Sequence, residues 1–210
     1  MDTTFIISII IVILSLVIHE LGHAYAATAM GDDIPRLQGR LSINPLRHLE
    51  WFGSLIFPGI LMLTGSPLVF GWAKPVMFNE RNFTGDIGRR YGRVITAIAG
   101  PLMNIILVVV FGIITRVFIG YHIMTPELFT LMSMVVMINL SLALFNLIPL
   151  PPLDGHYIWD MVMPRSLQLG RVTHGGNIIV FIVMILIAVI IWNQVFEPII
   201  PQLVKIIIGV

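Results

Sequence analysis

The sequence predicts an all-α polytopic membrane protein, with about four spanning helices, a re-entrant segment and short membrane-associated β-strands. Hydrophobic residues make up 57% of the 210 residues and charged residues only 11%, against about 25% charged residues in an average soluble protein. Mean hydropathy is +0.96. Four apolar stretches are each long enough to cross a lipid bilayer as a helix of about 20 residues. We expect one membrane-embedded domain over residues 1–210.

The first spanning helix is expected over residues 5–27. Its first part, Phe5 to Ile18, carries no charge and only two polar side chains, Ser8 and Ser15. The segment lacks the positive charges and the cleavage site of a signal peptide, so we expect it to be retained. Further spanning helices are expected over residues 94–118, 128–150 and 177–196. The apolar tail after residue 196 is expected to lie at the membrane interface.

The region between the first two helices is expected to be extended and re-entrant. Arg36–Asn44 alternates roughly between polar and apolar side chains, which is typical of a short strand or hairpin. A Pro-Gly pair interrupts the apolar run that follows, and two more prolines disfavour helix over residues 66–76. We therefore predict a re-entrant segment over residues 51–76. The alternative is a short helix that spans the membrane.

The basic residues predict the orientation of the chain. Eight of the 12 Lys and Arg residues lie between Gly31 and Arg93, two more lie in the 151–175 loop, and the 120–127 loop has none. Lys and Arg are enriched in cytoplasmic loops. We therefore expect the N-terminus outside a cell membrane and the end of the first helix near the cytoplasmic face. The net charge of +1 gives no indication of a nucleic-acid partner.

The sequence His19-Glu20-Leu21-Gly22-His23 at the end of the first apolar run is the candidate chemical site. In a helix the two histidines lie four residues apart on one face, where both imidazoles can bind one zinc ion. Glu20 then lies beside the metal and can take a proton from a water molecule. Ionisable groups within a membrane helix are costly and usually functional. The alternative is that they only form hydrogen bonds between helices.

A catalytic zinc ion needs a third protein ligand, and the absence of cysteine leaves histidine, aspartate and glutamate. Asp154 is the leading candidate, because prolines end the helix before it and Gly155 permits a sharp turn. Two alternatives stay open. Asp154 could merely cap the following helix, and His156 could bind the metal instead or tune it.

A zinc site shared by His19 and Asp154 places a condition on the topology. The first and third helices must end on the same side of the membrane. Because the second and third helices form a hairpin, the segment from residue 27 to 93 must cross the membrane an even number of times. A re-entrant segment meets this condition, and a single crossing would separate the ligands.

These motifs resemble the site-2 protease family of intramembrane zinc metalloproteases. The resemblance rests on His19 to His23 in a membrane helix, on Ala99-Gly100-Pro101 opening a later helix and on Asn146 to Gly155 closing the next. Gly71–Val76 resembles the signature of the small bacterial branch of this family. The chain has no PDZ-like insertion, so substrate filtering by such a domain is not expected.

The resemblance implies one zinc ion per chain on His19, His23 and Asp154, with Glu20 as the general base. It further implies that Asn146 holds the substrate backbone or the developing oxyanion, and Asn104 is a second candidate for this role. For Asn146 the alternative is a hydrogen bond between helices. The catalytic core is expected over residues 5–156, followed by a C-terminal helix and tail over residues 157–210.

The expected function is hydrolysis of a peptide bond within or near the transmembrane segment of a single-span or other membrane protein. Substrate backbone could then pair with an extended edge at Arg36–Asn44 or Gly71–Val76. Two other functions remain as alternatives. A multi-pass metal-ion transporter would place ligands along several helices, and a non-catalytic metal-binding protein would not need Glu20.

Overall fold

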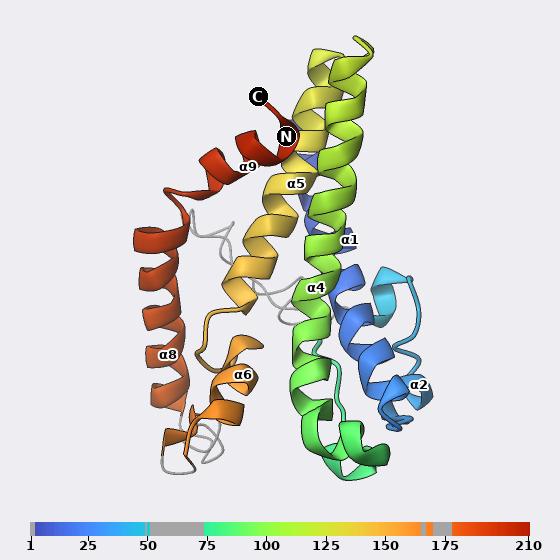
Figure 1. Ribbon diagram of the computed structural model, residues 1–210, viewed down its shortest axis with the longest axis vertical. Coiled ribbons are helices and arrows are strands. Elements are labelled where there is room, and N and C mark those ends of the chain that lie inside the picture. Colours follow the sequence, from blue (N-terminus) through green and yellow to red (C-terminus); the bar gives the residue numbers. More distant parts are fainter. Residues whose placement is uncertain (1–2, 49, 51–73, 165–166, 170–177) are drawn as a thin grey trace.

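A computed structural model of the chain describes residues 3–48, 50, 74–164, 167–169 and 178–210 (Figure 1). Three of its helices are long and apolar enough to cross a membrane, namely α1, α4 and α5. In chain order the helices of the described residues are α1 (Thr3–Ala29), α2 (Ile34–Leu37), η1 (Pro45–Arg47), η3 (Glu80–Asn82), α4 (Gly85–Gly120), α5 (Pro126–Asn146), α6 (Gly155–Val162), α8 (Ile178–Ile191), η5 (Trp192–Phe196) and α9 (Ile200–Ile208).

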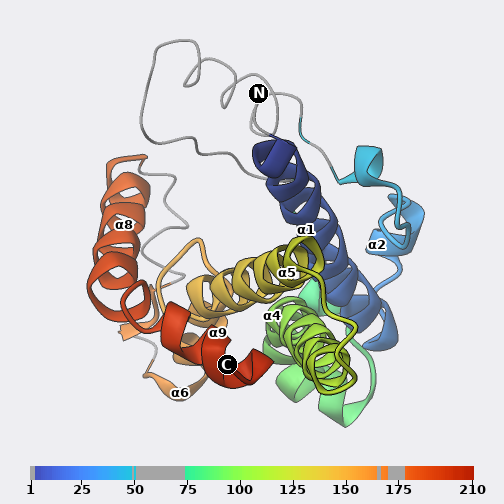
Figure 2. The same ribbon diagram turned by 90° about the horizontal axis from the view of Figure 1, so that it is seen from above.

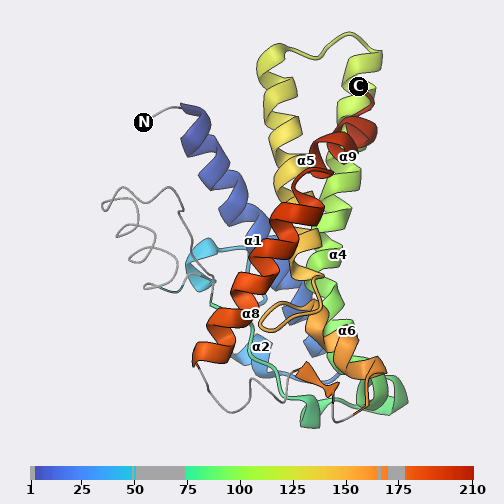
Figure 3. The ribbon, with the colours of Figure 1, turned by 90° about the vertical axis from the view of Figure 1, so that its left-hand side faces the viewer.

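Helices α1, α4 and α5 form the bundle that carries the candidate site. Figures 1 and 3 show α4 and α5 running in opposite directions, with the end of α1, the start of α4 and helix α6 gathered at one end of the molecule. This is the arrangement that an even number of crossings between α1 and α4 requires. The predicted re-entrant segment itself lies largely outside the described residues, because residues 51–73 are not described.

Small residues let α1 and α4 pack closely. A side chain at Gly22 would place its Cβ 2.5 Å from the carbonyl oxygen of Ala99, so only glycine fits at this crossing. Pro101 was expected to open a helix, but it lies inside α4. Helix α4 begins at Gly85 rather than at residue 94, because its arginine-rich first turns favour helix beyond the apolar stretch.

The prediction of a strand or hairpin over Arg36–Asn44 is wrong. Helix α2 continues to Leu37, and Gly39 then makes a turn with a φ of +68°. Pro35 lies in the first turn of α2, where its missing N–H costs no hydrogen bond. The described part of the second predicted edge, Lys74–Val76, is irregular. The described residues therefore contain helices and irregular segments without a β-strand.

The C-terminal region also differs from the prediction. The fourth expected span consists of α8 and the π-helical turn η5, and the stretch Ile182–Phe196 is bent by 55° from α9. The described helices therefore support three spans, or four if this bent pair counts as one. Figure 2 shows α8 set apart from the bundle and joined to it through η5 and α9.

The tail expected at the membrane interface packs against the bundle. Helix α9 presents three residues to α4 and α5, and together they form a buried apolar cluster of Val108, Val136, Leu140, Ile200, Val204 and Ile208. Burial of several aliphatic side chains outweighs the prolines that interrupt this region. The C-terminal helix thereby fixes α4 against α5, the two helices behind the candidate site.

Asp32 anchors the connection between α1 and α4. Its carboxylate is fully buried and accepts hydrogen bonds from Asn79 N and from Asn82 Nδ2, each at 2.7 Å. Since a buried carboxylate is stable only when such donors satisfy it, this contact fixes the chain that leads into α4. The segment just before it, Lys74–Val76, thereby passes close to α1.

Candidate metal centre

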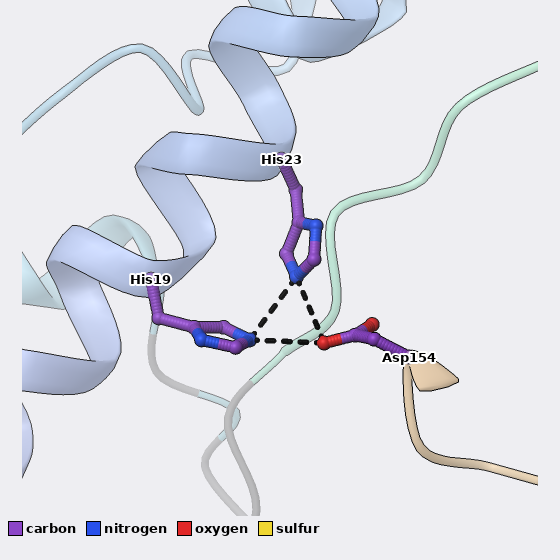
Figure 4. Close-up of side chains that lie close together, drawn as sticks. All are labelled: His19, His23 and Asp154. Atoms are coloured by element: carbon purple, nitrogen blue, oxygen red, sulfur yellow. Dashed lines mark hydrogen bonds and ion pairs between the residues drawn. The ribbon is translucent and has the colours of Figure 1, made fainter. Parts of the chain in front are cut away.

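Two histidines of α1 and one aspartate before α6 converge on a single point (Figure 4). His19 and His23 project from adjacent turns of α1, and their Nε2 atoms lie 3.1 Å apart. Oδ2 of Asp154 lies 3.2 Å from Nε2 of His19 and 3.3 Å from Nε2 of His23. The two imidazoles are buried, with 4% and 8% of their residue surface exposed, whereas Asp154 is partly exposed.

Asp154 reaches the histidines because the chain turns sharply after α5. Helix α5 ends at Asn146, since Pro149 disfavours helix in the residue before it. At Gly155 an added Cβ would lie 2.3 Å from the carbonyl oxygen of Leu147, so the turn requires glycine here. Asp154 occupies the N-cap position of α6, but its side chain makes no capping hydrogen bond. The carboxylate faces α1 instead.

The geometry of the three atoms fits a tetrahedral metal ion. Zinc holds nitrogen and oxygen ligands at about 2.0–2.2 Å, which separates neighbouring tetrahedral ligand atoms by roughly 3.3 Å. The three separations here, 3.1, 3.2 and 3.3 Å, are close to that value. A set of two imidazole nitrogens and one carboxylate oxygen also matches the ligand chemistry of catalytic zinc, which keeps a fourth position for water.

The outer ring nitrogens fix the tautomer of both histidines. Nδ1 of His23 donates to the carbonyl oxygen of Thr96 at 2.7 Å, and Nδ1 of His19 donates to Oδ1 of Asn104 at 2.6 Å. With the protons on Nδ1, both Nε2 lone pairs point at the carboxylate oxygen of Asp154. Three acceptors this close repel one another unless a cation lies between them, so this arrangement favours metal binding.

Asn104 belongs to a buried polar network behind His19. Its Nδ2 donates to Oδ1 of Asn139 at 2.8 Å and to the carbonyl oxygen of Ser15 at 3.3 Å. Nδ2 of Asn139 donates in turn to Oγ of Ser15 at 2.9 Å. Asn104 and Asn139 are both 0% exposed. The network joins α1, α4 and α5 and holds Asn104 so that its oxygen faces the imidazole.

Gly100 lets α4 approach the metal centre. An added Cβ at this position would lie 2.3 Å from Nε2 of His23 and 2.8 Å from Nε2 of His19. The backbone of α4 therefore forms one wall of the site, and any side chain here would occupy the space of the ligand atoms. In the Gly100-Pro101 pair noted in the sequence, glycine is therefore required at position 100 for steric reasons.

Glu20 lies beside the cluster and is held by the chain that precedes α4. The backbone N–H of Val76 donates to Oε2 of Glu20 at 3.1 Å. The Glu20 side chain is half-buried, whereas His19 and His23 on the same helix are buried. This bond orients the Oε2 atom of the Glu20 carboxylate.

His156 lies apart from the three converging ligand atoms. Its Nδ1 donates to the carbonyl oxygen of Leu153 at 2.6 Å, and its ring contacts that of Tyr157 at 3.9 Å between centroids. Burial lowers the pKa of His156 below its ordinary value, so the imidazole is neutral near pH 7. Among the described residues, the group able to hold a metal ion comprises His19, His23 and Asp154.

Asn146 is the last residue of α5. Its Nδ2 donates to the carbonyl oxygen of Leu142 at 2.9 Å, one turn back in its own helix, and the side chain is half-buried. This bond is neither to a metal ligand nor to another helix. A contact with a substrate therefore remains a prediction for Asn146.

Several groups around the site were not predicted from the sequence. The carbonyl of Thr96 and the N–H of Val76 carry no sequence signal, because every residue offers such groups. For Ser15 and Asn139, in contrast, the sequence does contain a signal. Ser15 lies four residues before His19 on the same face of α1, and Asn139 is a polar residue within an apolar helix, which is usually functional.

Comparisons with known proteins place the chain in a family. The family model described as peptidase family M50 matches residues 7–126 and 117–191. The protein named "Putative zinc metalloprotease YwhC" of Bacillus subtilis (strain 168) is 36% identical over 183 residues, which cover 84% of this chain and 78% of that protein.

Two proteins named "Putative zinc metalloprotease Rip2" are more distant. Those of Mycolicibacterium smegmatis and Mycobacterium tuberculosis (strain H37Rv) are 26% and 25% identical, over 82% and 84% of this chain. The chain spans 64% of the length of each, less than two thirds. No solved structure matches the chain.

Proposed function

The chain belongs to peptidase family M50 and is a zinc metalloprotease, and on this premise we propose that it cleaves its substrates inside the membrane. The proposed reaction is hydrolysis of a peptide bond within or near the transmembrane segment of a single-span or other membrane protein. The observation that carries the proposal is the place of His19 and His23 in α1, a helix apolar enough to span a bilayer. We assign catalysis to residues 5–156 and treat residues 157–210 as a C-terminal extension of the same domain.

We assign His19, His23 and Asp154 as the ligands of one zinc ion and Glu20 as the general base. A zinc ion held by these residues would lower the pKa of a water molecule at the site and polarise the scissile carbonyl. Glu20 accepts a proton from the attacking water and passes it to the leaving amine. Because the N–H of Val76 holds Oε2 of Glu20, we assign the proton transfer to Oε1.

We assign different roles to the two asparagines. Asn146 is proposed to hold the substrate backbone or the developing oxyanion, since its Nδ2 donates to a carbonyl of its own helix and could exchange that acceptor for a substrate carbonyl. The geometry favours a different role for Asn104. Both its amide oxygen and its amide nitrogen are engaged within the buried network, so we propose that it orients His19.

We propose that the N-terminus lies outside a cell membrane and the metal centre near the cytoplasmic face. Two observations support this orientation of the multi-pass chain. The first turns of α4 carry Arg89, Arg90 and Arg93, whereas the 121–125 connection between α4 and α5 has neither Lys nor Arg. The end of α1 and helix α6 lie at the same end of the molecule as these arginines (Figure 1).

Nothing in the described part of the chain favours transport of metal ions. A transport path needs polar ligands at several depths, whereas the described residues place the candidate ligands in one cluster.

A transmembrane substrate helix keeps its carbonyls in its own hydrogen bonds and must unwind before water can attack one of them. The substrate is therefore expected to contain a segment with weak helix propensity at the cleaved bond.

The proposal is tested by mapping the cleaved bond. The full chain is reconstituted into liposomes with a single-span protein that carries Gly and Pro within its transmembrane segment, and the products are identified by mass spectrometry. We expect cleavage within or next to that segment, and we expect it to stop with a zinc chelator and to return when zinc is added. A matched substrate has the same flanking sequences around a soluble helix. Cleavage of the soluble substrate alone would contradict the intramembrane assignment.

A further inference from the structure

Arg40 is an unusually buried charge outside the metal centre. Its side chain is 2% exposed and is the largest of the fully buried side chains in the described residues. Arginine remains protonated in proteins, and burial of an unsatisfied charge is costly. An arginine in such a place therefore needs a structural or functional reason.

The guanidinium of Arg40 joins two segments that are far apart in the sequence. Its Nη1 donates to the carbonyl oxygen of Arg47 at 2.7 Å and contacts that of Lys74 at 3.3 Å. Its Nη2 contacts the carbonyl oxygen of Pro75 at 3.5 Å. The two longer contacts are weak as hydrogen bonds, but a full positive charge still attracts both carbonyl dipoles.

A backbone hydrogen bond reinforces this junction. The N–H of Lys74 donates to the carbonyl oxygen of His48 at 2.9 Å, and the buried His48 ring donates from Nε2 to the carbonyl oxygen of Ser42 at 2.7 Å. The residues that follow α2 thus form a platform for Lys74–Val76. Arg40 lies at its centre and contacts both sides.

The platform leads directly to the catalytic carboxylate. Val76, the residue after the two carbonyls that Arg40 contacts, donates its N–H to Oε2 of Glu20 at 3.1 Å. Burial lowers the pKa of Arg40, and the nearby carboxylate of Glu20 opposes that shift. Arg40 and Glu20 are therefore coupled both through Val76 and through their opposite charges.

We propose that Arg40 is a positioning residue for peptide hydrolysis. Its guanidinium holds the Lys74–Val76 segment in place, so that the N–H of Val76 keeps Glu20 aligned with the zinc ligands. This proposal rests on the proposed role of Glu20 as general base. It predicts a loss in the rate of the chemical step, with substrate binding and zinc binding left intact.

The test compares Arg40→Gln with wild type as full-length protein in detergent, for kcat, KM, bound zinc and thermal unfolding. A misplaced catalytic group costs roughly 10- to 100-fold in rate, and kcat is expected to fall by that factor while KM and zinc content stay within about twofold. Arg40→Lys is expected to recover part of kcat, since an ammonium keeps the charge but cannot reach all three carbonyls. Arg89→Gln makes the same chemical change at an exposed site of α4 and should leave kcat unchanged.

A second variant keeps the proposal testable if Arg40→Gln does not fold. Val76→Pro removes the N–H that binds Glu20 and leaves Arg40 in place, and it should lower kcat by a similar factor. A normal kcat in either folded variant, or a rise in KM alone, would overturn the proposal. Loss of zinc in step with kcat would overturn it too. The variant Glu20→Gln separates the two hypotheses. If Glu20→Gln cleaves normally, the assignment of Glu20 as the base fails. If Glu20→Gln is inactive while Arg40→Gln is fully active, only the proposed role of Arg40 is rejected.

Discussion

Oδ1 of Asn104 in α4 lies 2.6 Å from Nδ1 of His19 in α1, and both side chains are buried. This contact fixes the imidazole with its Nε2 facing His23 and Asp154. The candidate metal centre thus draws on three parts of the chain: α1 supplies two of the proposed ligands, α4 orients them, and the turn after α5 supplies the third.

Replacement of Asn104 should weaken zinc binding. Asn104→Leu removes the acceptor for His19 and leaves its Nδ1–H unpaired in a buried place. Loss of such a partner typically lowers metal affinity by about 10- to 100-fold, which competition with a chromophoric chelator would measure. Thr115→Val is the matched control, because Thr115 is equally buried in α4 and, among the described residues, its hydroxyl donates to Phe111 of its own helix. Equal zinc affinity in the two variants would refute the orienting role.

A methyl group at position 100 should disrupt the centre. In Gly100→Ala the new Cβ would fall 2.3 Å from Nε2 of His23, so the helices must separate or the ring must rotate. We expect activity to fall by about 100-fold, the cost of a displacement near 1 Å in an active site. Gly120→Ala adds the same methyl group to α4 where nothing lies within 4 Å, and should leave activity and zinc content unchanged.

Replacement of Asp154 and His156 tests which of them binds zinc. Asp154→Ala should lose most of the bound zinc after dialysis, as measured by atomic absorption, because only two ligands remain. His156→Ala should retain one zinc ion per chain, since His156 bonds to Leu153 and lies outside the cluster. The reverse result would transfer the third ligand to His156.

Asn146 should affect the reaction and not the metal. If it holds the substrate carbonyl in the transition state, Asn146→Ala should lower kcat by about 100-fold, as loss of one oxyanion donor does elsewhere. Zinc content should stay at one ion per chain. Asn193→Ala, at an exposed residue of η5, serves as the control. An unchanged kcat in Asn146→Ala would assign this asparagine to the structure of α5.

The candidate ligands could be proposed from the sequence because the side chains that bind zinc, histidine and carboxylate, are recognisable from residue type and spacing. His19 and His23 are one helical turn apart, which indicated two zinc ligands, and the prolines before Asp154 made it the leading third candidate, with His156 left open. The full set of three ligands followed only from the resemblance to the site-2 protease family. The three long apolar helices were predictable as well, since a bilayer requires a continuous apolar stretch of about 20 residues.

The parts that were missed depend on contacts between distant segments. Arg36–Asn44 alternates like a strand, but Pro35 and Gly39 set the local backbone and the segment forms α2 and a turn. The docking of α9 on α4 and α5 and the burial of Arg40 also depend on neighbours far away in the sequence. Polar residues such as Asn139 were visible in an apolar helix, but their partners were not.

The central claim is that Glu20 supplies the base at a zinc site formed by His19, His23 and Asp154. The most direct test measures zinc content and cleavage of a transmembrane substrate on the same preparation of Glu20→Gln. Glutamine keeps the size of the side chain and can still accept the hydrogen bond from Val76, but it cannot take up a proton at neutral pH. We expect one zinc ion per chain and cleavage reduced by at least about 100-fold. Cleavage at the wild-type rate with zinc bound would contradict it.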